Sequence, residues 1–283
     1  MKVCRFNGGR LGIVDGDAVV DVSSFLDSLP ALRWNFPLAC PVVENLPGLY
    51  EYWQEGDHES TLPYSQVRLE SPLARPSKIV GAPVNYHAHL EEARADRDLH
   101  QDRRVHPIDE IGLFLKASSA LSGPSDPLAL CQPERRSDHE AEVVAVIGRL
   151  AKDVRAADAL DYVAGYTLGL DVSIRGKEDR SMRKSADGYA VLGPYLVTAD
   201  EAGDPGALDF ALHVNGELRQ TGHTSALIRS IPELIEMASA FYTLYPGDAI
   251  MTGTPEGVAA LAGGDRLVVS SPQLGSLEVN VQT

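Results

Sequence analysis

Several features that would place a 283-residue chain in a specialised class are scarce or missing. Only three cysteines occur, Cys4, Cys40 and Cys131, and their odd number and wide spacing exclude a disulfide framework and a cysteine zinc site. They are typical of free thiols in a reducing compartment. The chain has no run of about 18 apolar residues, and its N-terminus lacks the apolar core of a signal peptide. We therefore expect a cytoplasmic protein that has no membrane partner.

Basic residues are also fewer than acidic ones. The chain has 25 Lys and Arg against 40 Asp and Glu, which gives a formal net charge of −15. This balance disfavours a nucleic-acid partner, because such binding needs cations that neutralise phosphates. It still allows a small anionic substrate, since a single pocket can be positive on an acidic protein. With 44% hydrophobic and 23% charged residues, the composition excludes a disordered chain and favours a globular one.

Short apolar strands separated by turn residues dominate the chain, and helical signals are few. Residues 1–73 are predicted to form a small β-rich domain, joined by a proline-containing linker to a larger domain over residues 74–283. Within the small domain, a serine at 23 or 24 is expected to cap a short helix to residue 29, and residues 30–63 are expected to be irregular. Regular alternation of strands and helices is absent, so we predict a β-dominated α+β fold.

The larger domain shows its elements more clearly. A charge-rich segment, residues 94–109, is predicted to be either a solvated loop or a mobile lid. A Ser230–Glu233 capping box opens a helix that ends before Pro246. Further helices are expected at 87–98 and 156–163. Strands are expected at 79–80, 113–116, 140–147, 165–172, 189–197, 210–214, 249–252, 267–270 and 277–281.

Carboxylates occur at the ends of two otherwise apolar strands. Glu140 and Glu142 share one strand face, because residues i and i+2 point the same way, and Asp171 ends the next apolar strand. Buried carboxylates repel each other unless a cation joins them, whereas a strand end in water would leave them solvated. Together the three predict an all-oxygen site for Mg²⁺ or Mn²⁺, with Ca²⁺ a further candidate. Zinc is disfavoured, because His139 is expected to point to the opposite face.

The segment around these glutamates, Asp-His-Glu-Ala-Glu followed by an apolar run and Ile-Gly at 138–148, resembles the signature of the fumarylacetoacetate hydrolase family. Other segments resemble the motifs of this family in the same order and cover residues 78 to about 281. They are 85–89, 115–119, 151–154, 163–167, 183–188, 192–194, 214–217 and 252–258. The resemblance implies a mixed β-roll, a small N-terminal domain, a homodimer, and a metal held by Glu140, Glu142 and Asp171.

The resemblance also implies a reaction class. Its substrates are small oxo-acids with a second carbonyl nearby, often from the breakdown of aromatic rings. A metal chelated by such an acid is a Lewis acid. His89, with Glu92 three residues further along a helix, is the expected base that activates water. Lys184 is expected to neutralise the developing oxyanion or to hold a substrate carboxylate.

Five more residues are candidates for substrate binding. Lys116 has the same roles as Lys184, and Arg175 is a candidate fork for a carboxylate. Thr254 and Gly253 offer a hydroxyl and backbone N–H groups, and Tyr86 lies in the Asn-Tyr-x-x-His segment. The alternative for Lys116 is an ordinary surface charge, and for the segment with Gly253 and Thr254 it is an ordinary turn.

Four positions depart from the family pattern. Leu170, Gly176, Ala117 and Ala186 replace its usual Asn, Asp, Pro and aromatic residue, which spares the metal ligands but reshapes the pocket. We expect a metal-dependent hydrolase that cleaves a C–C bond in an acylpyruvate-type diketo acid, similar to fumarylacetoacetate or fumarylpyruvate. The alternatives are a decarboxylase or isomerase of a hydroxymuconate-like or homoprotocatechuate-pathway diacid, and a catalytically silent metal-binding protein.

Overall fold

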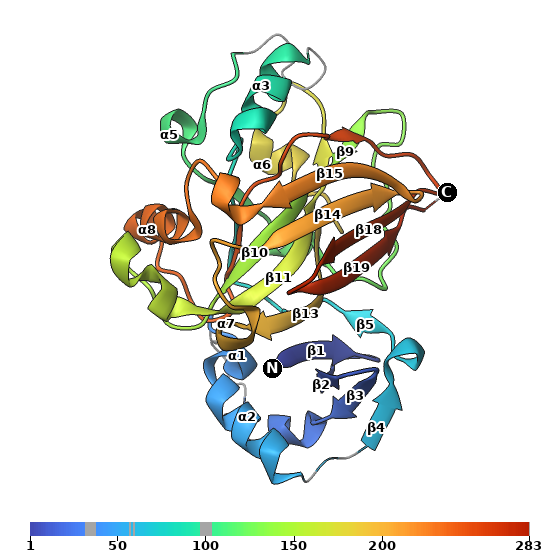
Figure 1. The fold of residues 1–283 in the computed structure, drawn as a ribbon, viewed down its shortest axis with the longest axis vertical. Helices are drawn as coiled ribbons and strands as arrows, with labels where there is room; N and C mark the ends of the chain where they lie inside the picture. Colours follow the sequence, from blue (N-terminus) through green and yellow to red (C-terminus); the bar gives the residue numbers. More distant parts are fainter. Residues whose placement is uncertain (32–37, 57, 59, 97–103, 283) are drawn as a thin grey trace.

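The computed structural model describes residues 1–31, 38–56, 58, 60–96 and 104–282. Figure 1 shows a large β-rich body and, below it, a smaller group of strands and helices formed by the N-terminal residues. The predicted β-dominated α+β class is confirmed. Within the described ranges, no helix has the length and apolar character needed to span a membrane.

The N-terminal strands form one side of a twelve-stranded sheet. Strand β1 (Lys2–Phe6) pairs with β2 (Arg10–Asp15), and β2 pairs with β3 (Ala18–Asp21), all antiparallel. Strand β4 (Ser60–Pro63) adds to β3, and β5 (Leu69–Glu70) pairs with the end of β1. The β1–β2 hairpin turns at Gly8 and Gly9 and the β2–β3 hairpin at Gly16, all with a positive φ.

The same sheet continues into the larger part of the chain. Its further strands are β6 (Ile79–Gly81), β7 (Phe114–Lys116), β8 (Leu121–Ser122), β10 (Ala141–Ile147), β11 (Val163–Asp171), β13 (Ala190–Thr198) and β16 (Ala249–Met251). From β1 the order runs β13-β11-β10-β16-β6-β7, and β8 pairs with β13. The junction is antiparallel, with Lys2 opposite Val197.

Two smaller sheets cover the body. The four-stranded sheet comprises β14 (Asp209–Val214), β15 (Glu217–His223), β18 (Arg266–Ser271) and β19 (Gly275–Asn280), in the order β15-β14-β18-β19. The three-stranded sheet comprises β9 (Ser137–His139), β12 (Ser173–Ile174) and β17 (Ala259–Ala260), with β9 in the middle. Strand β9 leads through Glu140 directly into β10. The three-stranded sheet therefore adjoins Glu140, the first of the three predicted metal-binding carboxylates.

Short helices complete the fold. The α-helices are α1 (Pro41–Glu44), α2 (Leu46–Glu55), α3 (His87–Ala95), α5 (Ile108–Ile111), α6 (Arg180–Arg183), α7 (Ala199–Ala202) and α8 (Ile231–Phe241). The 3₁₀ helices are η1 (Ser23–Ser28), η2 (Tyr64–Gln66), η3 (Ser118–Ala120), η4 (Ala156–Tyr162) and η5 (Thr224–Ala226). Helix α8 has the predicted capping box of Ser230 and Glu233.

Three local predictions need correction. Residues 30–63 were expected to be irregular, but they contain α1, α2 and β4. Pro41 and Pro47 lie in the first turns of α1 and α2, where a missing N–H costs nothing, so they start helices and do not break them. No serine side chain caps η1, whose preceding residue is Val22. The helix expected at 156–163 is the 3₁₀ helix η4.

Strand β10 is covered on both faces. Val143 and Ala145 belong to one buried apolar cluster, and Val144 and Val146 belong to the other. This explains why its sequence is an almost continuous apolar run, as in strands buried on both sides. Polar residues at the start of β10 are therefore exceptional, and they lie at the candidate site.

Candidate active site

Three acidic residues meet at one end of β10 and β11. Glu140 directly precedes β10, Glu142 is its second residue, and Asp171 ends β11. The two strands are antiparallel, with Ala141 opposite Leu170, so the start of one lies beside the end of the other. All three side chains are buried, and one oxygen from each lies within 4.8 Å of the others. In the part of the chain that the structure describes, no other cluster of three potential ligands occurs, and His139 is not part of this one.

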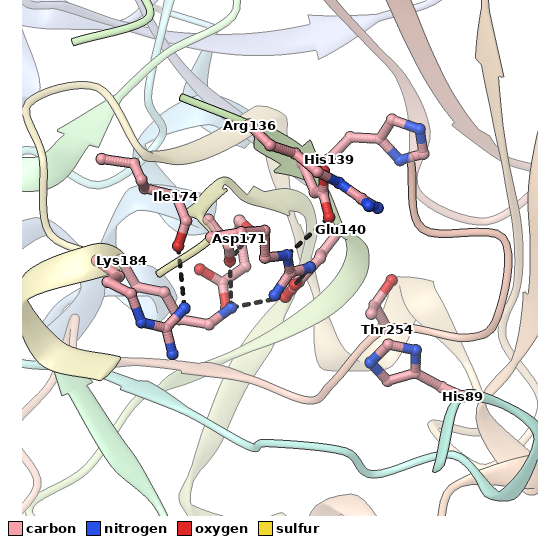
Figure 2. A network of polar contacts seen from close by, with 12 residues as sticks. His89, Arg136, His139, Glu140, Asp171, Ile174, Lys184 and Thr254 are labelled. Atoms are coloured by element: carbon pink, nitrogen blue, oxygen red, sulfur yellow. Dashed lines mark hydrogen bonds and ion pairs between the residues drawn. The ribbon is translucent and has the colours of Figure 1, made fainter. Parts of the chain in front are cut away.

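Cationic side chains neutralise two of the three carboxylates. The Lys184 ammonium donates to Glu140 and to Asp171, each at 2.6 Å, and Lys116 also donates to Asp171. Arg175 donates to Glu140 at 2.7 Å. Figure 2 shows Lys184 on one side of the Glu140 and Asp171 carboxylates, with His89 and Thr254 on the other. Burial acts to raise the pKa of Glu140, but Lys184 and Arg175 outweigh it and hold this pKa well below its usual range.

The Glu142 carboxylate is different, because no cationic side chain among the described residues contacts it. Its hydrogen bond comes from the backbone N–H of Gly253, at 2.7 Å. Burial, and next the charge of Asp171, raise the pKa of Glu142 well above its usual value. A divalent cation would supply the missing positive charge, and three carboxylates are the oxygen donors that Mg²⁺, Mn²⁺ and Ca²⁺ prefer. The residues present therefore fit a hard divalent cation.

The predicted His89–Glu92 pair is present on α3. His89 Nδ1 lies 2.9 Å from one oxygen of Glu92, and the other oxygen accepts a hydrogen bond from the Gly257 N–H at 2.8 Å. With Nδ1–H donating to Glu92, the Nε2 atom of His89 is left to accept a proton. The Gly257 contact fixes the carboxylate, and the carboxylate fixes the ring.

A cavity of about 160 Å³ brings most of the predicted site residues together. Of these residues, its wall contains His89, Glu140, Glu142, Asp171, Arg175, Lys184 and Thr254. Both the candidate metal ligands and the candidate base therefore face the same space.

Four predicted residues do not line this cavity: Glu92, Lys116, Gly253 and Tyr86. Glu92 contacts His89, which does line the cavity, and the buried Lys116 contacts Asp171. The N–H of Gly253, which we expected to face the substrate, is taken by Glu142 instead. Its φ of 101° favours glycine, and a Cβ there would lie 2.7 Å from that of Asn85. Tyr86 is buried, and its hydroxyl has no hydrogen-bond partner among the described residues.

Arg175 lines the cavity, and two of its three nitrogens donate to protein carboxylates. Its Nε donates to Asp138 at 2.7 Å, in addition to the contact with Glu140. These contacts hold Glu140 in place, and the role of Arg175 as a fork for a substrate carboxylate stays a prediction.

Sequence reasoning missed several residues of this site. Ser173 accepts a hydrogen bond from Lys184, and Gln220 of β15 donates to the Thr254 hydroxyl at 2.7 Å. Arg180 and Arg183 of α6 line the cavity. The available signal for Gln220 was a polar side chain at an inward position of an alternating strand, where its neighbours Arg219 and Thr221 are exposed.

The C-terminal part of the charge-rich segment 94–109, which the structure describes from residue 104 on, reaches the cavity. Helix α3 ends at Ala95, and Arg104, Val105 and His106 line the cavity. Residues 97–103 lie outside the described residues, so the choice between a solvated loop and a lid stays a prediction.

Comparison with known proteins shows which family the chain belongs to. The family model for the C-terminal domain of fumarylacetoacetate (FAA) hydrolase matches residues 78–282. The chain belongs to the fumarylacetoacetate hydrolase family. The resemblance seen in the sequence motifs is thereby confirmed, and the fold is the one that the family shares.

Three proteins of known name are similar to this chain over nearly its whole length. Maleylpyruvate hydrolase of Aquipseudomonas alcaligenes is 44% identical over 286 residues, which cover all of both chains. The structure of maleylpyruvate hydrolase from Sphingobium sp. SYK-6, in complex with manganese(II) and pyruvate, has a TM-score of 0.84 at 38% identity and covers 100% of this chain and 99% of its own. A 5-carboxymethyl-2-hydroxymuconate delta-isomerase from Mycobacterium smegmatis has a TM-score of 0.73 at 29% identity, with 100% and 99% coverage.

Proposed function

We propose that this protein is a metal-dependent hydrolase that cleaves a C–C bond in a small diketo acid of the maleylpyruvate or fumarylpyruvate type. The observation that carries the proposal is the full-length identity of 44% with a maleylpyruvate hydrolase, combined with a buried triad of carboxylates beside a His–Glu pair. Such acids arise when aromatic rings are opened, so the proposal includes a role in aromatic catabolism. The proposed cofactor is Mg²⁺ or Mn²⁺, held by Glu140, Glu142 and Asp171.

The residues around the cavity have different roles in the proposed reaction. A divalent cation bound at the triad would act as a Lewis acid for the oxygens of the 2-oxo acid. His89 accepts a proton from water through Nε2, while Glu92 orients the ring and stabilises the imidazolium. The resulting hydroxide attacks the C4 carbonyl, and the C3–C4 bond breaks. One fragment leaves as a carboxylic acid, and the pyruvate fragment takes a proton at C3.

Lys184 and Thr254 complete the proposed machinery. Three acceptors, Glu140, Asp171 and Ser173, hold the Lys184 ammonium, so it positions two of the metal ligands. A cation at the triad would compete for these carboxylates and so release Lys184 donors toward a substrate oxygen. Thr254 accepts a hydrogen bond from Gln220, so its own proton is available to a substrate oxygen in the cavity.

Isomerisation or decarboxylation is the second candidate function. The similarity to the structure of a 5-carboxymethyl-2-hydroxymuconate delta-isomerase favours isomerisation. In that case His89 moves a proton of the substrate and no water attacks. Products therefore separate the candidates: two acids for hydrolysis, CO₂ for decarboxylation, or a shifted double bond for isomerisation.

The first test measures products and metal binding in the same set of proteins. With Mn²⁺ and maleylpyruvate or fumarylpyruvate, the wild type should release pyruvate and maleate or fumarate. His89→Ala should bind Mn²⁺ normally and lose about 10²- to 10⁴-fold in turnover, as expected for a general base. Glu142→Ala should lose both, because it removes a ligand. Loss of metal in His89→Ala, or pyruvate release by Glu142→Ala at the wild-type rate, would contradict these roles.

We also propose a cytoplasmic homodimer. The described cysteines are unpaired, as is usual in a reducing compartment. Phe241 is 83% exposed and Leu150 58%, which gives apolar surface that a second copy can cover. Light scattering after size exclusion should give about twice the chain mass of 30.5 kDa, and the mass of a single chain would refute the dimer.

A further inference from the structure

The cavity contains more positive side chains than the candidate metal site uses. Arg104, Arg175, Arg180, Arg183 and Lys184 all contribute to its wall. Most of them already have protein partners. Arg175 is held by Asp138 and Glu140, Lys184 by the metal-ligand carboxylates, and Arg183 donates to the carbonyl oxygens of Glu178 and Ile174.

Arg180 differs from these residues. Among the described residues, no hydrogen bond or ion pair engages its guanidinium, although the side chain is partly buried. Burial lowers the pKa of Arg180, and the charges of Glu140 and Asp171 offset this effect only from a distance. A desolvated guanidinium without an anionic partner costs free energy, which an anionic ligand would recover.

The surroundings of Arg180 keep its hydrogen-bonding edge available. Its guanidinium carbon lies 5.8 Å from the centre of the Phe114 ring. Contact of a guanidinium face with an aromatic ring leaves the N–H groups at the edge free for a planar carboxylate. Helix α6 is fixed at its start by Asp179, whose side chain accepts from the Ser181 N–H at 2.8 Å. Arg180 is therefore presented from an anchored turn.

We propose that Arg180 binds the second carboxylate of a dicarboxylate substrate, and so selects diketo acids that end in a carboxylate over those that end in an alkyl group. The inference rests on the proposed function, in which the 2-oxo acid end of the substrate lies at the carboxylate triad. The opposite end then needs its own cation. Arg104 is the other candidate, but it is exposed, so solvent would weaken the contact.

The test uses one matched pair of binding ligands and one pair of substrates. For binding, Mn²⁺-loaded protein is titrated with 2-oxoheptanedioate and with 2-oxoheptanoate, which differ only in the terminal carboxylate and contain no cleavable diketone. For turnover, maleylpyruvate is compared with 2,4-dioxopentanoate, which ends in a methyl group. The wild type should prefer the diacid in both pairs. Arg180→Met should lose roughly 10- to 100-fold in affinity and in kcat/KM for the diacids, and stay within about twofold for the monoacids.

Controls separate this role from a structural one. Arg180→Met should keep the wild-type thermal shift with Mn²⁺ alone, and Arg180→Lys should restore part of the diacid preference. Lys177→Met removes a charge from the same segment without touching the cavity wall, and Arg104→Met removes the rival cation; both should leave the preference unchanged. An equal loss for both ligands of a pair, or loss of the preference in Arg104→Met, would overturn the inference. Because the binding pair needs no hydrolysis, a wild type that binds selectively but cleaves nothing would refute only the proposed reaction.

Discussion

Gln220 shows how one buried side chain sets the direction of a hydroxyl in the cavity. Its amide oxygen accepts from the Ala141 N–H at 3.0 Å, and its amide nitrogen donates to the Pro255 carbonyl at 2.9 Å and to Thr254 at 2.7 Å. A backbone N–H only donates and a carbonyl only accepts, so the amide cannot be turned round. The Thr254 oxygen therefore receives a hydrogen bond from the protein, and its proton is directed elsewhere.

Replacing this amide should be costly for the fold. Gln220→Leu leaves the Ala141 N–H and the Pro255 carbonyl without their partner in a buried place. We expect a loss of about 2 kcal/mol or more in the free energy of unfolding, since each buried group left unsatisfied costs about 1–3 kcal/mol. Urea unfolding followed by circular dichroism measures this. Gln54→Leu, at an exposed position of α2, should change stability by less than about 0.5 kcal/mol. Equal stability of the two variants would show that the network contributes nothing.

Residues of this site differ in how far the sequence predicts them. Glu140, Glu142 and Asp171 were predictable because each interrupts or ends an apolar strand, and a charge there needs a reason. Gln220 and Arg180 were not, because their importance depends on contacts with segments far away in the chain. Lysine and arginine are usually solvated, so the sequence gives no sign of which cation lacks a protein partner.

Helix α8 is the element whose start the sequence defines best. The Ser230 hydroxyl and backbone N–H both donate to one oxygen of Glu233, at 2.7 and 2.8 Å. These hydrogen bonds, first that of the side chain, lower the pKa of Glu233 below its ordinary value of 4.5. A lowered carboxylate pKa stabilises the fold at pH values above about 4.5, and this contribution is lost as pH falls through the lower folded-state value.

The capping box therefore predicts a stability difference that depends on pH. Ser230→Ala should lower the free energy of unfolding by about 1 kcal/mol at pH 7, as is typical for loss of an N-cap. The difference from wild type should shrink below pH 4.5, because protonated Glu233 no longer gains from the serine. Urea unfolding at a series of pH values measures it. Glu233→Gln keeps a hydrogen-bonding side chain without ionisation, so its own stability should lack this pH dependence. A Ser230→Ala difference that stays constant down to pH 3 would argue against the Glu233 contact.

Other elements were harder to predict, for physical reasons. Proline can start a helix or prevent one, and the sequence alone does not decide between these two effects. Pro41 and Pro47 each lie in the first turn of a helix. Residues of strand β4 alternate between half-buried and exposed without a strong apolar alternation in sequence, and the strand exists because it pairs with β3. Short elements of this kind depend on tertiary contacts more than on local preference.

At the scale of the whole molecule, the N-terminal residues and the family-matched region share structure. Strand β1 pairs with β13, and residues of both regions enter one apolar cluster, in which Val3 and Ile13 join Val144 and Leu192. The sequence predicted the general class, whereas the division into domains over residues 1–73 and 74–283, which the proline-containing linker suggested, stays a prediction. A linker shows where the chain is extended; it does not show whether the segments on either side share a core.

This shared core makes a prediction about cooperativity. Both tryptophans, Trp34 and Trp53, lie within residues 1–73, so their fluorescence reports on the N-terminal part, whereas circular dichroism reports on the whole chain. If the sheet is one unit, the two signals should change at the same urea concentration, which is the test of a two-state transition. Fluorescence that changes at clearly lower urea would instead support residues 1–73 as an independent domain. A chain that starts at residue 74 provides the complementary measurement. It would leave Leu196 and Val197 of β13 without their partner strand β1 and remove Val3 and Ile13 from the cluster of Val144 and Leu192, so we expect it to aggregate or to unfold at lower urea than the full chain.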